Sequence, residues 1–164
     1  MSDNQPVHLL HPELQSLLVH WFLACEGRAM PRKTELPMRT LQTWSDNVAL
    51  IVPAAFGEAR RYYFHFSGEG LIARFGRAMT CRCLRDIDET MRGDLRASLE
   101  SVRRNAAPAL ARAPVPRGRV QVRMWSDLVL PLAEPDDTVG RLIFASYRPA
   151  PRACTLPIRT IDAA

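Results

Sequence analysis

Two segments near the C-terminal end of the chain place the strongest constraint on its fold. Residues 119–132 alternate two rows of side chains, one formed by Val120, Val122, Met124, Leu128 and Leu130 and the other by Arg123, Trp125 and Asp127. Residues 139–147 follow after a Glu-Pro-Asp-Asp turn at 134–137. Side chains that alternate with a period of two indicate strands, and strands joined by a short turn pair antiparallel. The pattern therefore predicts an antiparallel sheet at this end of the chain.

Three earlier segments add strands to this prediction. Residues 47–52 are apolar and bounded by Pro53, and residues 61–66 alternate an aromatic row with a more polar one. We predict that these two segments are neighbouring strands. Residues 107–116 hold three prolines. Because proline cannot donate a hydrogen bond to a central ladder, this segment is predicted to be an edge strand or an irregular connector.

Helices are predicted before and between these strands. In residues 12–26 the apolar side chains recur every three or four positions, which is typical of an amphipathic helix. A proline-bearing connector at 30–37 follows it. Residues 71–75 are predicted to form a short helix that Gly76 ends, and residues 89–105 a longer one.

The composition fits one soluble domain. The chain has 164 residues, of which 47% are hydrophobic and 24% charged, so a multidomain enzyme is excluded. No apolar run reaches the roughly 18 to 20 residues of a membrane span, and the polar opening at residues 1–5 does not resemble a signal peptide. We therefore expect a cytoplasmic protein whose four cysteines stay reduced.

The motifs of common enzyme classes are missing from the sequence. It contains neither a glycine-rich phosphate loop nor a dinucleotide fingerprint. Three of the four histidines lie near the N-terminus, and only His65 falls in a predicted core strand. We therefore predict no catalytic residues and no enzymatic activity.

The cysteines allow two interpretations. The Cys81-x-Cys83 spacing occurs once, so it is a weak indication of a metal site, and we interpret these residues as small hydrophobic side chains. The alternative is a redox-sensitive thiol at Cys81, whose pKa the nearby Arg77, Arg82 and Arg85 would lower if the thiol is exposed. No metal ligand set is predicted.

The order of the predicted elements resembles the PAS fold, and in detail a bacterial family of single-domain PAS proteins with an N-terminal helix. The matching positions are Trp21, Gly27, Arg28, Met30-Pro31-Arg32, residues 62–66 and 72–77, Met79-Thr80 and Leu130-Pro131-Leu132. Two positions depart from the family pattern. Cys81 stands where glycine is usual, and Ser67-Gly68 stands where Gly-Thr is common. The departure at Cys81 matters for the local turn, because only glycine takes a positive φ without strain.

The resemblance implies an α+β fold, in which a five-stranded antiparallel sheet has helices on one face and an N-terminal amphipathic helix is added. It also implies a division of the chain into a flexible N-terminus at 1–11, a PAS-like domain at 12–147 including the helix at 12–26, and a loose tail at 148–164.

A PAS fold encloses space between its sheet and its helices, and such a pocket suits a small apolar ligand. The residues that we expect to line it are Phe64, Phe66, Leu71, Phe75, Met124, Leu128, Leu130 and Phe144. The alternative is that these side chains simply fill the space as core. The sequence names no cofactor, and the Asn-Cys-Arg-Phe-Leu-Gln motif of flavin-binding light sensors is missing.

The other face of the sheet is the second candidate site. Trp125 and Val129 are predicted to point away from the pocket, where the first helix would cover them with Leu17, Leu18 and Trp21. A second copy of the chain could cover them instead, so we expect this set to form a partner or dimer face and the chain to form a homodimer.

Together these observations predict a non-enzymatic signalling module, a sensor or adaptor that contacts a protein partner and that a small ligand can gate. The alternative is a small-molecule-binding or isomerase-like α+β cone protein, in which Tyr63, His65 and Asp127 would converge. A third hypothesis uses the net charge of +5 and an arginine-rich stretch to contact nucleic acid, at Arg103, Arg104, Arg112, Arg117, Arg119 and Arg123. We consider nucleic acid a poorer fit than a protein partner, because no reader motif accompanies the charge.

Overall fold

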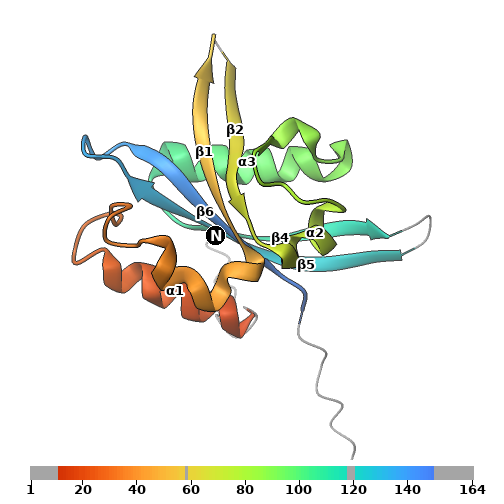
Figure 1. Cartoon of the computed structure of the whole chain (residues 1–164), viewed down its shortest axis with the longest axis horizontal. Helices are drawn as coiled ribbons and strands as arrows, with labels where there is room; N and C mark the ends of the chain where they lie inside the picture. The colour runs from red at the N-terminus through yellow and green to blue at the C-terminus, as the bar shows by residue number, and fades with distance from the viewer. Residues whose placement is uncertain (1–10, 58, 118–120, 150–164) are drawn as a thin grey trace, which may run out of the picture.

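The centre of the structure, a computed structural model, is one antiparallel sheet with the strand order β3-β2-β1-β6-β5-β4 (Figure 1). The structure describes residues 11–57, 59–117 and 121–149. The strands in these ranges are β1 (Val48–Phe56), β2 (Ala59–Ser67), β3 (Arg82–Cys83), β4 (Ala109–Arg117), β5 (Gln121–Ala133) and β6 (Val139–Tyr147). The helices are α1 (Pro12–Ala24), α2 (Ile72–Phe75) and α3 (Glu89–Asn105), with short 3₁₀ helices η2 (Met38–Asn47), η3 (Glu69–Leu71) and η4 (Leu84–Asp86).

The predicted fold class is confirmed, with one correction to the strand count. The helix at 89–105 and the strand at 139–147 have the bounds that the sequence predicts, and α1 ends two residues before the predicted position 26. The described sheet has six strands rather than five. The additional strand, β3, is only two residues long and pairs with Tyr63 and Phe64 of β2. A segment of two residues is too short to show the alternation by which strands are predicted.

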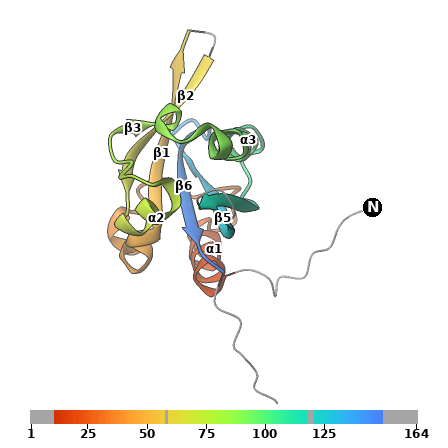
Figure 2. The same ribbon diagram turned by 90° about the vertical axis from the view of Figure 1, so that its right-hand side faces the viewer.

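Both faces of the sheet are buried. On one face, which we call the α1-side core, α1 and η2 pack against Val48, Leu50, Leu128, Leu130, Leu132, Ile143 and Ala145. On the opposite face, the helix-side core, α2 and α3 pack against Ala49, Ile51, Tyr62, Phe64, Val129, Leu142 and Phe144 (Figure 2). Successive residues of a strand point to opposite faces, so Leu128 and Val129 belong to different cores.

The α1 helix is fixed to the sheet by its aromatic side chain and by the connector that follows it. The indole Nε1 of Trp21 donates a hydrogen bond to the carbonyl of Pro131, at 2.8 Å. The backbone N–H of Ala133 donates to the carbonyl of Pro31, at 2.9 Å. The C-terminal part of α1 and the connector that follows it are therefore both anchored to β5.

A change of register in β2 corrects the prediction for Phe66. Leu50 pairs with Phe66 and Ile51 pairs with Phe64, so His65 has no partner in β1. One additional residue of this kind is a β-bulge, and it reverses the face to which the following side chains point. Phe66 consequently packs against the α1-side core, although Phe64 lies in the helix-side core.

Prolines lie where the strands have a free edge. Pro114 and Pro116 are in β4, the last strand of the sheet, which agrees with the predicted edge position. Pro53 lies inside β1 rather than at its end. The strand β1 pairs with β6 only from Val48 to Ile51 and beyond that pairs with β2 alone. Pro53 therefore lies in a part of β1 with one free edge, where its missing N–H is tolerated.

No helix in the described ranges is both long enough and apolar enough to cross a membrane.

Candidate functional site

The residues predicted to line a ligand pocket are divided between the two faces of the sheet. Phe64, Leu71, Phe75 and Phe144 come together in the helix-side core. Leu128, Leu130 and Phe66 pack in the α1-side core, and 41% of Met124 is exposed. The reason is that β5 is apolar on both faces, so its alternation does not reveal which row faces the helices. The eight residues therefore do not share one lining.

Three phenylalanines fill the space between α2 and the sheet. The ring of Phe75 lies 5.7 Å from that of Phe64 in an edge-on arrangement and 5.7 Å from that of Phe144. All three side chains are buried. Aromatic pairs at this separation attract one another beyond the burial of their area. This part of the predicted pocket is therefore occupied by side chains.

Next to these rings lies a buried polar cluster that the sequence analysis did not identify. The Nη2 of Arg74 is 3.0 Å from Oδ2 of Asp127, and the hydroxyl of Ser146 donates to Oδ1 of the same carboxylate. All three residues are buried. They come from α2, β5 and β6 respectively. The cluster therefore joins a helix to two strands inside the helix-side core.

The remaining contacts of Arg74 are weaker. Its Nη1 lies 3.1 Å from the sulfur of Met91 on α3, and its guanidinium carbon is 5.5 Å from the centre of the Phe75 ring. Its Nε is buried and has no hydrogen-bond partner. A buried donor without a partner carries a desolvation penalty, so this helix-to-sheet contact is not fully satisfied.

The Asp127 side of the cluster also borders a surface groove. The groove has a volume of about 400 Å³ and runs between α3 and β4. Its lining is formed by Asp94, Leu95, Ala97, Ser98, Ala111, Arg112, Ala113 and Asp127. The buried ion pair therefore lies beside the contact between α3 and β4. One signal for it was present in the sequence, since Asp127 is the one carboxylate in β5 and directly precedes an apolar run, and a buried charge needs a partner.

The predicted partner face is largely covered within the chain. Leu17 and Trp21 are buried against the sheet, and Leu18 packs partly against the same core. Trp125 and Val129 each lie two positions from Asp127 in β5, so their side chains point to the same face as that of Asp127. This is the face opposite α1. The guanidinium of Arg148 lies 5.2 Å from the Trp125 ring centre. These five residues therefore do not form one surface.

The outer face of α1 is exposed and apolar instead. Val19, Phe22 and Leu23 are 57%, 69% and 68% exposed. A groove of about 390 Å³ continues from this patch, lined by Phe22, Leu23, Cys25, Glu26, Gly27 and Arg28. The helix is thus apolar toward the sheet and toward solvent, whereas an amphipathic surface helix has one polar side.

The cysteines occupy different environments. Cys25 is buried, and this burial raises the pKa of its thiol. Cys81 is exposed, with a positive φ of 60°, in the turn where the family pattern has glycine, and Cys83 is half-buried. These three thiols are free, and Cys154 lies outside the described residues. The described ranges also contain no group of His, Cys, Asp and Glu side chains arranged to hold a metal ion.

The residues of the alternative cone-protein hypothesis do not converge. Tyr63 and His65 are exposed, whereas Asp127 is buried in the helix-side core against Arg74. Within the arginine-rich stretch, Arg103 forms an ion pair with Glu100, and Arg104, Arg112 and Arg123 are exposed. Arg119 lies outside the described residues, as does the side chain of Arg117.

Comparison with solved structures identifies the fold. A light-oxygen-voltage domain studied with a flavin analogue matches with a TM-score of 0.50 at 12% identity, over 68% of this chain and 83% of that chain. A sensory box sensor histidine kinase from Vibrio cholerae matches with a TM-score of 0.47 at 12% identity, over 72% and 91% of the two chains. No family model and no curated protein matches the sequence. The match at a TM-score of 0.50 shows that the chain has the α+β fold of PAS-type sensory domains, as its resemblance to them predicts.

Proposed function

We propose that this chain is a non-enzymatic PAS-type signalling module of the cytoplasm that acts through protein contact, and that the outer face of α1 binds a second copy of the chain. The fold of sensory domains supports the general role. The location of the contact face rests on one observation, the exposure of Val19, Phe22 and Leu23 on a helix that already buries its other face.

The spacing of these three side chains suits a helix contact. Residues 19, 22 and 23 are separated by three and four positions, so they form one stripe on the helix surface. The helix is presented as a fixed element, because Trp21 on its inner side is hydrogen-bonded to Pro131. A contiguous apolar patch on a fixed element is typical of an interaction site.

The charge of the patch favours a second copy as the occupant. Residues 15–25 contain no Asp, Glu, Lys or Arg. In a twofold dimer each patch faces its own copy, so a charged patch would repel itself and an uncharged apolar patch is self-complementary. The adjoining groove next to Phe22 and Leu23 extends the area that such a pair would bury.

The sheet supplies a physical route between the interior and this face. In β5, Asp127 and Val129 contact the helix-side core, and Leu128 and Leu130 contact α1. A rearrangement of the Arg74–Asp127 pair would therefore displace the same strand that carries α1. The filled interior favours gating by a partner over gating by an apolar ligand, since Phe64, Phe75 and Phe144 occupy the space.

The proposal is tested by sedimentation velocity over a range of protein concentrations. We expect the unmodified chain to form a dimer, and the F22Q/L23Q variant to raise the dimer dissociation constant at least tenfold. Leu110→Gln serves as the control, because Leu110 is also exposed but lies on the edge strand β4. Equal association of the unmodified chain and F22Q/L23Q, or a monomer at every concentration, would contradict the proposal.

A further inference from the structure

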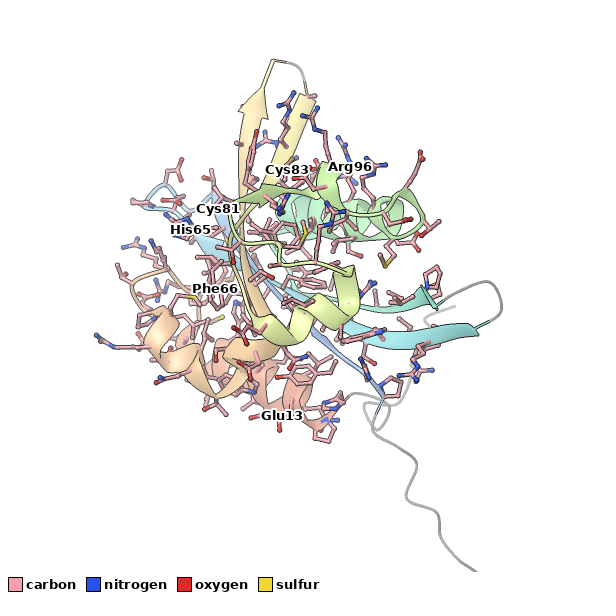
Figure 3. All side chains as sticks on the ribbon, turned by 45° about the vertical axis from the view of Figure 1, so that its right-hand side comes forward. Glu13, His65, Phe66, Cys81, Cys83 and Arg96 are labelled. Carbon is pink, nitrogen blue, oxygen red and sulfur yellow. The ribbon has the colours of Figure 1, made fainter. Side chains whose placement is uncertain are left out.

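A second pocket lies away from the α1 face, between β2, the β3–η4 segment and α3. It has a volume of about 210 Å³ and is lined by Ala59, Arg60, Arg61, Tyr62, Cys83, Leu84, Arg85, Arg92 and Arg96. Figure 3 shows Cys83 and Arg96 on this side of the molecule, where the nitrogen-tipped side chains of β2 and α3 gather. The pocket is thus built from three segments that are distant in sequence.

Five of the nine residues that line the pocket are arginines. Among the residues that the structure describes, no carboxylate lines the pocket. Among the described residues, Arg60, Arg85 and Arg96 have no ion-pair partner, and Arg92 donates a hydrogen bond to the carbonyl of Arg85, at 3.3 Å. Arg60 and Arg61 are neighbours in β2 and point to opposite faces of the sheet, so the charges that can face the cavity together are those of Arg60, Arg85, Arg92 and Arg96. Like charges gathered around one cavity create a positive local potential, which attracts an anion.

The carboxylates near the pocket are engaged elsewhere. Glu100 forms an ion pair with Arg103 and accepts a hydrogen bond from the hydroxyl of Tyr62. Asp86 accepts from the backbone N–H of Cys83, at 2.9 Å, and Asp88 accepts from the backbone N–H of Thr90, at 2.9 Å. These acidic groups are therefore held by donors of their own, and Glu100 also interacts electrostatically with Arg60.

We propose that this pocket binds a compact anion that carries two or more phosphate groups. The planar guanidinium of arginine matches the oxygens of phosphate and forms paired, charge-assisted hydrogen bonds with them. Several arginines that converge from β2, η4 and α3 can engage more than one phosphate at once. The volume is below the roughly 300 to 1,000 Å³ of sites for drug-sized ligands, so the site suits a short polyphosphate or the phosphate end of a nucleotide.

The test is calorimetric titration of the full chain with sodium tripolyphosphate, beside orthophosphate. We expect tripolyphosphate to bind and orthophosphate to bind at least tenfold more weakly. In the R85Q/R96Q variant the dissociation constant for tripolyphosphate should rise at least tenfold. Both arginines are exposed and neither donates a side-chain hydrogen bond within the described structure, so the fold should be retained, which a thermal melt checks.

The matched control is R39Q/R77Q, which removes two exposed arginines outside the pocket and changes the net charge equally. It should leave the dissociation constant for tripolyphosphate within about twofold. A titration with ATP distinguishes the two sources of the ligand: tighter binding of ATP than of tripolyphosphate assigns a nucleotide, and equal or weaker binding assigns a free polyphosphate.

Three results would overturn the proposal. The first is no binding of tripolyphosphate at millimolar concentration in low salt. The second is equal weakening in R85Q/R96Q and R39Q/R77Q, which would indicate attraction by net charge alone. The third is tight binding of a single-stranded oligonucleotide without any binding of tripolyphosphate. None of these results depends on dimerisation through α1.

Discussion

The Nη2 of Arg74 lies 3.0 Å from Oδ2 of Asp127 inside the helix-side core, where only 1% and 6% of the two side chains are exposed. The residues are 53 positions apart in the sequence and connect α2 to β5. A buried ion pair contributes little net stability compared with apolar residues, but the loss of one partner leaves an uncompensated charge. The pair therefore sets the position of α2 against the sheet.

Asp127→Asn should lower the free energy of unfolding by about 3–5 kcal/mol, because Arg74 would remain buried without its counterion. The double variant R74M/D127L should recover most of that loss, since it replaces both charges with apolar side chains of similar size. Urea unfolding measures both values. A D127N variant as stable as the unmodified chain would show that Arg74 reaches solvent instead.

Gly68→Ala should destabilise the domain, because a Cβ there would lie 2.0 Å from the carbonyl oxygen of Ser45 and 2.4 Å from that of Asp46. Backbone atoms cannot move aside cheaply, so a loss of at least about 1–3 kcal/mol is expected. Gly93→Ala on α3 is the control, because nothing lies within 4 Å of its Cβ position. It should stabilise the helix by about 0.5–1 kcal/mol. Thermal unfolding compares the two, and a harmless Gly68→Ala would mean that η2 does not approach this position.

Cys81→Gly should raise the free energy of unfolding by up to about 1 kcal/mol. Cys81 has a φ of 60°, which strains a residue with a side chain by about 1–2 kcal/mol and leaves glycine unstrained. Cys81→Ala separates this effect from loss of the thiol, since alanine keeps the strain and should be neutral. Denaturant unfolding under reducing conditions provides the measurement, and equal stabilities of the glycine and alanine variants would refute the expectation.

The free energy of unfolding should fall in acid, partly because Glu100 becomes protonated. Its ion pair with Arg103 and the hydrogen bond from Tyr62 lower its pKa from 4.5 to about 2. The folded state therefore holds the ionised form more strongly than the unfolded chain does, and this stabilisation is present above pH 4.5 and lost as the pH falls toward 2. Solvent screening limits the contribution to about 1 kcal/mol or less, because a third of the side chain is exposed.

Glu100→Gln should accordingly flatten the fall in stability between pH 4.5 and 2. Urea midpoints at several pH values measure the slope. Glu35, Asp88 and Asp136, whose pKa values are also lowered, keep their own contributions in both proteins. A Glu100→Gln variant with an unchanged slope would show that Arg103 and Tyr62 do not stabilise the ionised form of Glu100 in the folded protein.

The arrangement of helices and strands was predictable because the spacing of apolar residues within a segment indicates whether it forms a helix or a strand. The apolar spacing in residues 89–105 and the alternation in residues 139–147 gave bounds that the structure confirms. The assignment of faces was not predictable from β5, since residues 128–133 are apolar and buried on both faces and the row with Arg123 and Asp127 turns inward instead of marking the outside. The same limit explains why Trp125 was assigned to the wrong side.

Features that depend on pairing between distant segments escaped the sequence analysis. The bulge at His65, which redirects Phe66, is defined only by the partner strand. Arg74 meets Asp127 only after α2 docks on β5. The arginines at 60, 85, 92 and 96 come together through the packing of β2, η4 and α3, whereas inspection of the sequence favoured the denser stretch at 103–123.

The central claim is that the chain acts as a contact module with a filled interior, and native mass spectrometry of the freshly purified protein tests it most directly. The account predicts a complex of twice the 18.5 kDa chain mass with no retained small molecule from the interior. The denatured mass of the same sample provides the reference. A monomer that carries additional, dissociable mass would contradict both parts of the claim, because the α1 face would have no second copy and the space around Phe64, Phe75 and Phe144 would hold a ligand.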